Sequence, residues 1–187
     1  MRSLTLWPEW AWAVQVLGKR VENRPRPASH YGLHPGMEFA IHGGAHLGGR
    51  PGWAAALWGM GAVADAAGRA GVVVHTDFRG PRRPAIGHGA GPDYHLLTRD
   101  HYPAQSVVAV AVLDCCLGPV TIHARATLGP WEDDNSYRFR LRDVRPLSRP
   151  VPCTVQQYPG MRQGLWMLPG PVEAEVRAQL AAQPVPR

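Results

Sequence analysis

The fold is decided by the stretch Trp7-Pro8-Glu9-Trp10-Ala11-Trp12-Ala13-Val14-Gln15-Val16-Leu17-Gly18-Lys19-Arg20-Val21-Glu22-Asn23-Arg24. Its first half predicts a short helix, because Pro8 suits a first turn and the apolar residues recur at a spacing of three and four. Gly18 is the expected stop, since glycine is common just past a helix end. The second half then places a lysine, an acid and an arginine close together, at Lys19, Glu22 and Arg24.

Lys19 is the only lysine among the 20 lysine and arginine residues of the chain. Arginine is a planar fork that is permanently charged, whereas lysine is a compact point charge whose pKa falls readily on burial. We therefore expect Lys19 to have a role that arginine cannot fill. Of the nearby indoles, Trp10 is expected to be core, while Trp12 lies on a different helical face with Val16 and is interpreted either as core or as the lining of a pocket.

The bulk composition indicates one domain, or one domain with an insertion. The chain has 187 residues, of which 45% are hydrophobic, and this is enough for a core. It contains no apolar run of the roughly 18 residues that a membrane span needs. Pro8 and Glu9 interrupt any signal-peptide pattern at the N-terminus. The expected location is therefore the cytoplasm, without membrane contact.

Neither a metal site nor a cofactor is predicted. The three cysteines include no C-x-x-C pair, which argues against both a zinc site and a disulfide framework. His42 and His46 are four residues apart, but they lie on a glycine-rich loop rather than on one helical face. They are interpreted as polar residues at a rim.

The net charge of +6, with a pI of about 9.8, favours an anionic partner, with nucleic acid as the first candidate. The alternative is that the arginine-rich composition reflects coding bias and the charge only solvates the surface. The charge alone leaves both interpretations open.

Hydrophobic periodicity predicts many short strands with a helix at each end. Strands are expected at 37–42, 71–78, 106–115, 120–126, 137–144 and 164–168, and helices at 51–68 and 171–183, with a long loop over 79–92. The strand at 106–115 is apolar on both faces, so it should be central and buried. In 137–144, Tyr137, Phe139 and Leu141 should face inward and the arginines outward, giving a basic stripe of Arg138, Arg140 and Arg142. The stripe is interpreted either as a phosphate contact or as a solvated face.

Gly18-Lys19-x-x-Glu22-x-Arg24 resembles the G-x-K-x-x-E-x-R signature of ASCH domains, with one residue fewer between glycine and lysine. The helix before it resembles the usual lead-in of that family. The stretches 137–147 and 163–166 are similar to its closing strands. The resemblance covers the beginning and the end of the chain but not residues 50 to 105.

The resemblance implies an α+β fold in which helices flank a small PUA-like β-barrel, as a single domain over 1–187 with a helix and loop insertion at about 50–105. It also implies a nucleic-acid-binding module, for RNA more than DNA, or for a modified nucleotide. Relatives include amidohydrolases of acylated cytidine, which use a lysine and a threonine three residues later, and proteins described as ribonucleases. Here Glu22 stands at the threonine position, so the first activity is not expected in that form. A protein-interaction module is a third possibility, and the oligomeric state is left open.

The expected site is a cleft between the first helix and the barrel. Lys19 and Arg24 would contact phosphate or a base carbonyl, Glu22 would accept a hydrogen bond from a base amino group, and Trp12 would stack on the base. Arg138, Arg140 and Arg142 would add phosphate contacts. In an enzyme, Lys19 would stabilise charge while Glu22, or Asp114, acts as general base. A purely structural alternative is that Glu22 pairs with Arg24 and holds the loop in shape.

Overall fold

The computed structural model describes residues 1–45, 104–120, 128–129, 131–154, 157 and 165–183. The chain divides into two compact units, one comprising Met1–His46 with Pro103–Arg187 and the other comprising Leu47–Tyr102. The elements predicted at 51–68, 71–78 and 79–92 lie outside the described residues, as does most of the strand predicted at 120–126. One domain with an insertion stays a prediction.

Six strands form one sheet in the order β2-β5-β4-β3-β1-β6. Their bounds are β1 Arg2–Leu6, β2 Val21–Arg24, β3 Glu38–Gly43, β4 Ser106–Leu117, β5 Tyr137–Pro152 and β6 Leu165–Met167. All neighbours are antiparallel except β1 and β3, which are parallel with Leu4 opposite Ile41. With helices α1 (Pro8–Val16) and α4 (Gly170–Ala181), the described part has the α+β class that the sequence predicted.

Two hydrophobic cores lie on opposite faces of this sheet. One gathers Ala11 and Val14 of α1 with Phe39 and Ile41 of β3, and the other joins Ala40 of β3 to the apolar face of α4. β4 supplies Ala109 and Ala111 to the first core and Val110 to the second. Its predicted two-sided burial is therefore confirmed, because successive side chains of a strand point to opposite faces.

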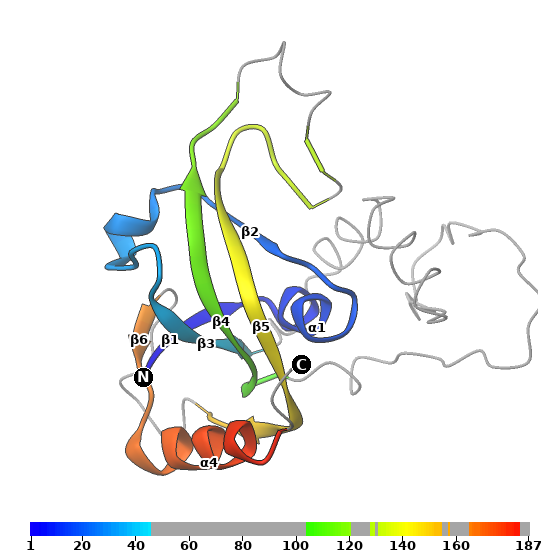
Figure 1. Ribbon diagram of the computed structural model, residues 1–187, viewed down its shortest axis with the longest axis vertical. Coiled ribbons are helices and arrows are strands. Elements are labelled where there is room, and N and C mark those ends of the chain that lie inside the picture. Colours follow the sequence, from blue (N-terminus) through cyan, green and yellow to red (C-terminus); the bar gives the residue numbers. More distant parts are fainter. Residues whose placement is uncertain (46–103, 121–127, 130, 155–156, 158–164, 184–187) are drawn as a thin grey trace, which may run out of the picture. The chain divides into compact units, whose positions relative to one another are not determined.

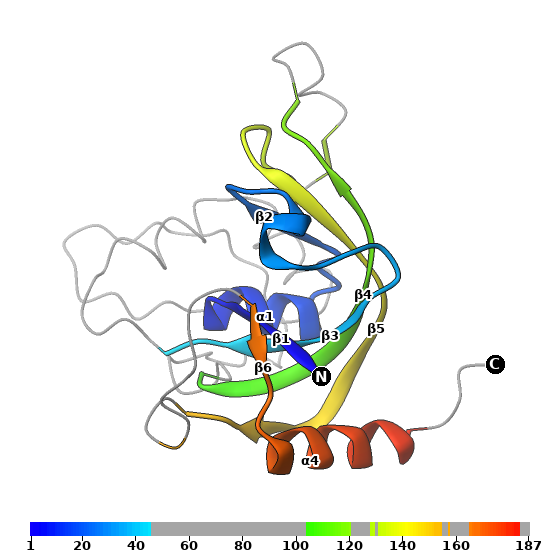
Figure 2. The ribbon, with the colours of Figure 1, turned by 90° about the vertical axis from the view of Figure 1, so that its left-hand side faces the viewer.

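The sheet curls strongly along its two long strands. Figure 2 shows β4 and β5 bending around α1, which lies on their concave side, while α4 runs beneath their far end. Register shifts between Val107 and Ala109, Val110 and Val112, and Leu113 and Cys115 accompany the bend, as β-bulges do. The curl brings β2 towards β1, although three strands separate them in the sheet order (Figure 1). Across this gap, Arg24 Nη2 donates to the Thr5 carbonyl oxygen at 2.5 Å.

Both terminal helices lie where the sequence placed them. α1 ends at Val16, and Gly18 follows with φ +70°, the left-handed conformation that glycine adopts at low cost. The Lys19 amide then donates back to the Ala13 carbonyl at 3.1 Å. In α4, Val172 and Val176 are buried and Leu180 packs against the same core, as predicted.

The sequence prediction missed two strands. β1 carries Leu4 and Leu6 into the core but is only five residues long, and β2 (Val-Glu-Asn-Arg) has little β-branched or aromatic character. β2 is a strand because it pairs with β5, with Val21 opposite Arg140 and Glu22 opposite Phe139. No helix among the described residues is both long and apolar enough to cross a bilayer.

Candidate functional site

Lys19 lies at the turn between α1 and β2 and is 1% exposed. Its Nζ donates to the Val21 carbonyl and, at 2.9 Å, to Glu22 Oε2. It also lies 5.1 Å from the centroid of the Trp10 ring, within cation–π range. Two acceptors and one ring face therefore surround the three ammonium hydrogens. A planar guanidinium could not reproduce these directions in the same space, which is a physical reason for the single lysine.

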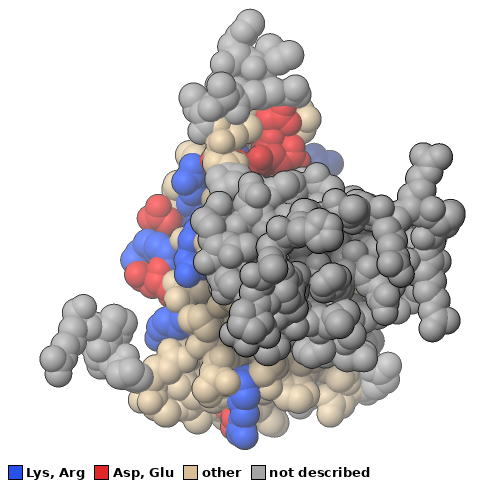
Figure 3. All heavy atoms as spheres, turned by 90° about the vertical axis from the view of Figure 1, so that its right-hand side faces the viewer, with Lys and Arg blue, Asp and Glu red and all other residues tan. Residues whose placement is uncertain are grey.

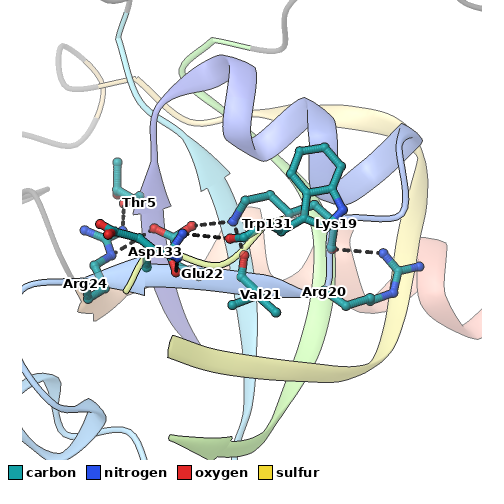
Figure 4. Close-up of polar contacts among 9 residues, drawn as sticks. Thr5, Lys19, Arg20, Val21, Glu22, Arg24, Trp131 and Asp133 are labelled. Atoms are coloured by element: carbon teal, nitrogen blue, oxygen red, sulfur yellow. Dashed lines mark hydrogen bonds and ion pairs between the residues drawn. The ribbon is translucent and has the colours of Figure 1, made fainter. Parts of the chain in front are cut away.

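Glu22 is shared between two cations. Its Oε2 accepts from Lys19, and its Oε1 lies 3.0 Å from Arg24 Nε. Arg24 also donates to Thr5 and lies over the Tyr31 ring, with 5.9 Å between Cζ and the ring centroid. Figure 4 shows the three charged heads converging along β2. The convergence predicted for Lys19, Glu22 and Arg24 is thus present in the described structure, and we call these three residues the β2 cluster.

The β2 cluster carries two positive charges and one negative charge in a largely desolvated position. The side chains of Lys19, Glu22 and Arg24 are 1%, 8% and 18% exposed. Burial lowers the pKa of the Lys19 ammonium below its usual range; Glu22 offsets part of this effect and Arg24 adds to it. Arg24 is the member of the cluster with the largest contact with solvent.

Two indoles other than the predicted one lie beside the β2 cluster. Trp10 covers Lys19, and the half-buried Trp131 meets Trp10 edge to face at 6.3 Å between ring centroids. Trp12, predicted to line a pocket and stack on a base, is only 7% exposed and belongs to the buried residues. Trp10 packs against the first core, as predicted, and it also covers Lys19, because the Gly18 turn brings Lys19 back beside it.

Trp131 begins a short acidic loop that is tied to β2. The Asn23 side chain donates its Nδ2 to the Trp131 carbonyl at 2.8 Å and accepts the Asp133 amide at 3.2 Å. Glu132, in the same loop, accepts the Gly129 amide at 2.6 Å. This acidic loop is therefore attached to the strand that carries the cluster, and Figure 4 shows its Trp131 and Asp133 beside β2.

The basic stripe differs from its prediction at one position. Arg140 and Arg142 are 44% and 51% exposed, but Arg138 is only 7% exposed, so the prediction that it is a solvent-facing member of the stripe is wrong. Glu132 explains the difference, because Oε1 lies 3.5 Å from Arg138 Nη1 and 2.8 Å from Arg140 Nη2. Figure 3 accordingly shows basic and acidic side chains interleaved along one side of the described surface. Phosphate contact by these arginines stays a prediction.

The other candidate acid and the candidate metal ligands lie apart from this arrangement. Asp114 is 55% exposed and lies 3.7 Å from Arg142 Nε. Within the described ranges, no group of three or more histidine, cysteine or acidic residues is arranged to hold a metal ion. His46 is outside those ranges, whereas His42 is buried in β3 rather than at a rim.

His42 belongs to a neutral polar network on the β1 side of the curl. Its Nε2 lies 3.0 Å from the Cys153 carbonyl oxygen, which can only accept, so Nε2 carries hydrogen. Nδ1 then accepts from the Thr5 hydroxyl at 3.3 Å, and Thr5 Oγ1 accepts from Trp166 Nε1 at 2.8 Å. Burial lowers the pKa of His42 below its usual range, only partly offset by the Cys153 contact. Thr5 therefore joins this network to Arg24.

Sequence reasoning missed Trp131, Asn23 and Thr5. Asn23 stands inside the quoted motif, between Glu22 and Arg24, but its amide partners lie more than 100 residues away in the chain. The available signal was the position of Trp131 at the head of an acidic loop directly before the arginine-rich strand. Pattern alone does not show that this loop returns to β2.

Comparisons with known proteins give similarity to solved structures only. No family model matches the sequence, and no curated protein matches it. The crystal structure of ASCH from Zymomonas mobilis is 16% identical with a TM-score of 0.46, covering 95% of this chain and 93% of that chain. A tyrosine-to-phenylalanine mutant of that protein is 14% identical (TM-score 0.46, coverage 95% and 96%), and a serine-to-alanine mutant is 16% identical (0.45, 95% and 94%). These solved structures carry the name of the family that the sequence motif resembles.

Proposed function

We propose that the chain binds single-stranded nucleic acid or a modified nucleotide at the β2 cluster, RNA in preference to DNA. The observation that supports this most is the convergence of Lys19, Glu22 and Arg24 into a cluster with one excess positive charge beside three aromatic rings. Positive charge attracts phosphate, a carboxylate accepts from base amino groups, and aromatic rings stack on unpaired bases. The preference for RNA rests on the resemblance to PUA-like domains.

Within this proposal the three charged residues have different roles. Lys19 is enclosed by Val21, Glu22 and Trp10, so it fixes Glu22 and contributes charge from below the surface. Arg24 is the residue that meets the ligand, because it is partly exposed while Glu22 holds its Nε. A guanidinium held in this way is preorganised for a phosphate or a base carbonyl.

The test is an anisotropy titration of a labelled eight-nucleotide RNA and of the matching DNA between 50 and 300 mM salt. We expect the logarithm of the affinity to fall linearly with the logarithm of the salt concentration, and the affinity for DNA to be lower than that for RNA. Arg24→Gln should lower the affinity and reduce the salt slope by about 0.7, the value for one phosphate of a single strand. Arg26→Gln, which changes an exposed arginine two residues later, is the matched control. No association at low salt, or equal effects of the two variants, would refute the proposal.

A second candidate, a hydrolase at the same cluster, is favoured by a specific observation. Lys19 is a desolvated amine with a lowered pKa, 2.9 Å from a carboxylate, and groups perturbed in this way recur at catalytic sites. Incubation with an N-acylated cytidine and with RNA, followed by mass spectrometry, separates the two functions. A binding module leaves both intact. A product that disappears in Lys19→Met would replace the binding proposal with the hydrolase.

A further inference from the structure

We infer that Trp131 is the base-stacking residue of the proposed nucleotide site and that Asn23 is its positioning residue. This inference rests on the proposed function and deepens it, since it assigns recognition of the base to a loop that the sequence motif does not include. The ligand class is an unpaired nucleobase with an open ring face. Neither residue belongs to the Gly-Lys-x-x-Glu-x-Arg pattern.

Trp131 lies beside the β2 cluster. Its ring meets Trp10 edge to face at 6.3 Å, and Trp10 lies over Lys19. The face of Trp10 is thus already used by an ammonium group. Trp131 is half-buried, whereas Trp12 is 7% exposed. Trp10 is half-buried as well, but its ring already lies against the Lys19 ammonium, so among these three indoles we assign the base contact to Trp131.

The backbone of Trp131 is held in place by side-chain hydrogen bonds. Asn23 makes two bonds to the loop, one to the Trp131 carbonyl and one from the Asp133 amide. Glu132 anchors the same loop to the Gly129 amide and to Arg140. Asp133 accepts in turn from the Ser136 hydroxyl at 2.7 Å and from the Asn135 amide at 3.0 Å. A ring on a loop held in this way loses little freedom when a base stacks on it.

Asn23 occupies a position in β2 that links the ionic group to the loop. It lies between Glu22 and Arg24, so one four-residue strand sets both the ionic group and the loop that carries the ring. An aspartate or alanine at this position would leave the Trp131 carbonyl without its side-chain donor. The loop that carries Trp131 would then no longer be linked through Asn23 to the strand that carries Arg24.

The test compares two eight-nucleotide probes with the full chain, an oligoadenylate and an abasic oligomer with the same phosphates. Stacking of one base on an aromatic ring corresponds to roughly 5- to 150-fold in affinity. We expect Trp131→Leu to weaken oligoadenylate binding within that range and to change abasic binding less than about twofold. Trp131→Phe, which keeps a ring, should retain most of the affinity. Asn23→Ala should lower the ratio of oligoadenylate affinity to abasic affinity by less than Trp131→Leu does. Asn135→Ala, in the same loop, should leave that ratio unchanged.

The outcomes are distinguishable. If the wild-type chain binds neither probe, the proposed function falls and the inference with it. If it binds both and Trp131→Leu keeps the wild-type ratio, or loses both probes equally, the inference alone is overturned. Ultraviolet cross-linking of wild-type protein to an oligomer of 5-bromouridine needs no variant to fold. The peptide containing Trp131 should carry the adduct, and adducts confined to other peptides overturn the inference.

Discussion

Two clusters in this molecule have the same composition, two cations around one carboxylate, and differ in how they are built. In the β2 cluster, Glu22 lies between Lys19 and Arg24, all within one turn and one short strand. In what we call the β5 cluster, Glu132 lies between Arg138 and Arg140 and joins a loop to a strand. The cations of the β2 cluster are 1% and 18% exposed, and those of the β5 cluster are 8% and 44% exposed.

The single lysine occupies the most buried cation position of the two clusters, at 1% exposure. A buried cation must find all its hydrogen-bond partners in the protein, and Lys19 does so with two acceptors and a ring. Arg140 can turn part of its fork to water. The β2 cluster should therefore be sensitive to each of its members, whereas the β5 cluster should tolerate exchange at Arg140, which is 44% exposed, but not at the buried Arg138.

The largest expected effect is removal of the central carboxylate of the β2 cluster. Glu22→Gln leaves Lys19 buried beside Arg24 without a counter-charge, and breaking a buried pair in this way costs about 3–5 kcal/mol. Glu132→Gln should cost less, about 1–3 kcal/mol, because Arg140 can be rehydrated. Urea unfolding monitored by tryptophan fluorescence measures both. Equal losses would mean that exposure does not distinguish the clusters.

The second effect is the exchange of the two cations. Lys19→Arg forces a larger planar group into a site that is 1% exposed, and overpacking of this kind costs about 1–3 kcal/mol. Arg140→Lys, the reverse exchange at an exposed position, should change stability by about 0.5 kcal/mol or less. We also expect oligonucleotide binding to suffer more from Lys19→Arg than from Arg140→Lys.

Thermal melts and anisotropy on the same preparations provide the measurement. If Lys19→Arg matches the wild type in both, the single lysine has no special role and the interpretation of the motif loses its basis. Lys19→Met is a useful second variant, since it keeps most of the length of the side chain and leaves Glu22 paired with Arg24. Its stability shows how much of the Lys19 contribution is charge rather than packing.

How well the sequence predicts the contacts of each cluster depends on how far apart the partners lie along the chain. Lys19, Glu22 and Arg24 lie within one segment, so their convergence follows from a helix stop at Gly18 and a short exit. The partners of Arg138 and Asn23 lie in the loop at 131–133, which returns to both strands. Strand alternation alone therefore predicts a solvent-exposed Arg138, and helical spacing alone does not show that Trp10 covers Lys19.

The same contrast applies to the fold. The two helices and the strands at 38–43, 106–117 and 165–167 carry a local hydrophobic signal, either a periodic pattern or a continuous apolar run, from which they are predicted. β2 has none, since its four residues are held as a strand by residues 137–140 of β5. The ring contact of Trp131 and the Thr5 carbonyl that receives Arg24 are likewise consequences of the curl. Such contacts are set by tertiary structure, which local patterns do not encode.

A third, neutral cluster sharpens the comparison through pH. The pKa of His42 is lowered in the folded state from an unfolded value of about 6.5. Its contribution to stability is therefore complete above that value and is lost as the pH falls from about 6.5 towards the lower folded pKa. The slope cannot exceed about 1.4 kcal/mol per pH unit for one proton. Urea unfolding between pH 5 and 7 measures it.

His42→Gln is the control, because an amide can still bond to Thr5 and Cys153 but does not titrate. The free energy of unfolding of the wild type minus that of His42→Gln should fall with decreasing pH over this window. Exposed histidines such as His30 and His34 are common to both proteins and cancel. A difference that is flat from pH 7 to pH 5 would show that the network accepts a charged imidazole.

The smallest effect concerns the arginines of the exposed stripe. Arg140 and Arg142 both have carboxylate partners, Glu132 for the first and Asp114 and Asp143 for the second. A phosphate must displace or share these partners, so the double change Arg140→Gln and Arg142→Gln should reduce the salt slope by less than the roughly 1.4 expected for two free contacts. Arg138→Gln should mainly lower stability, because its guanidinium is buried. Titration of the eight-nucleotide RNA at four salt concentrations resolves these cases. An unchanged slope in the double variant, with Arg24→Gln still reducing it, would confine phosphate contact to the β2 cluster and assign this face of β5 to solvent.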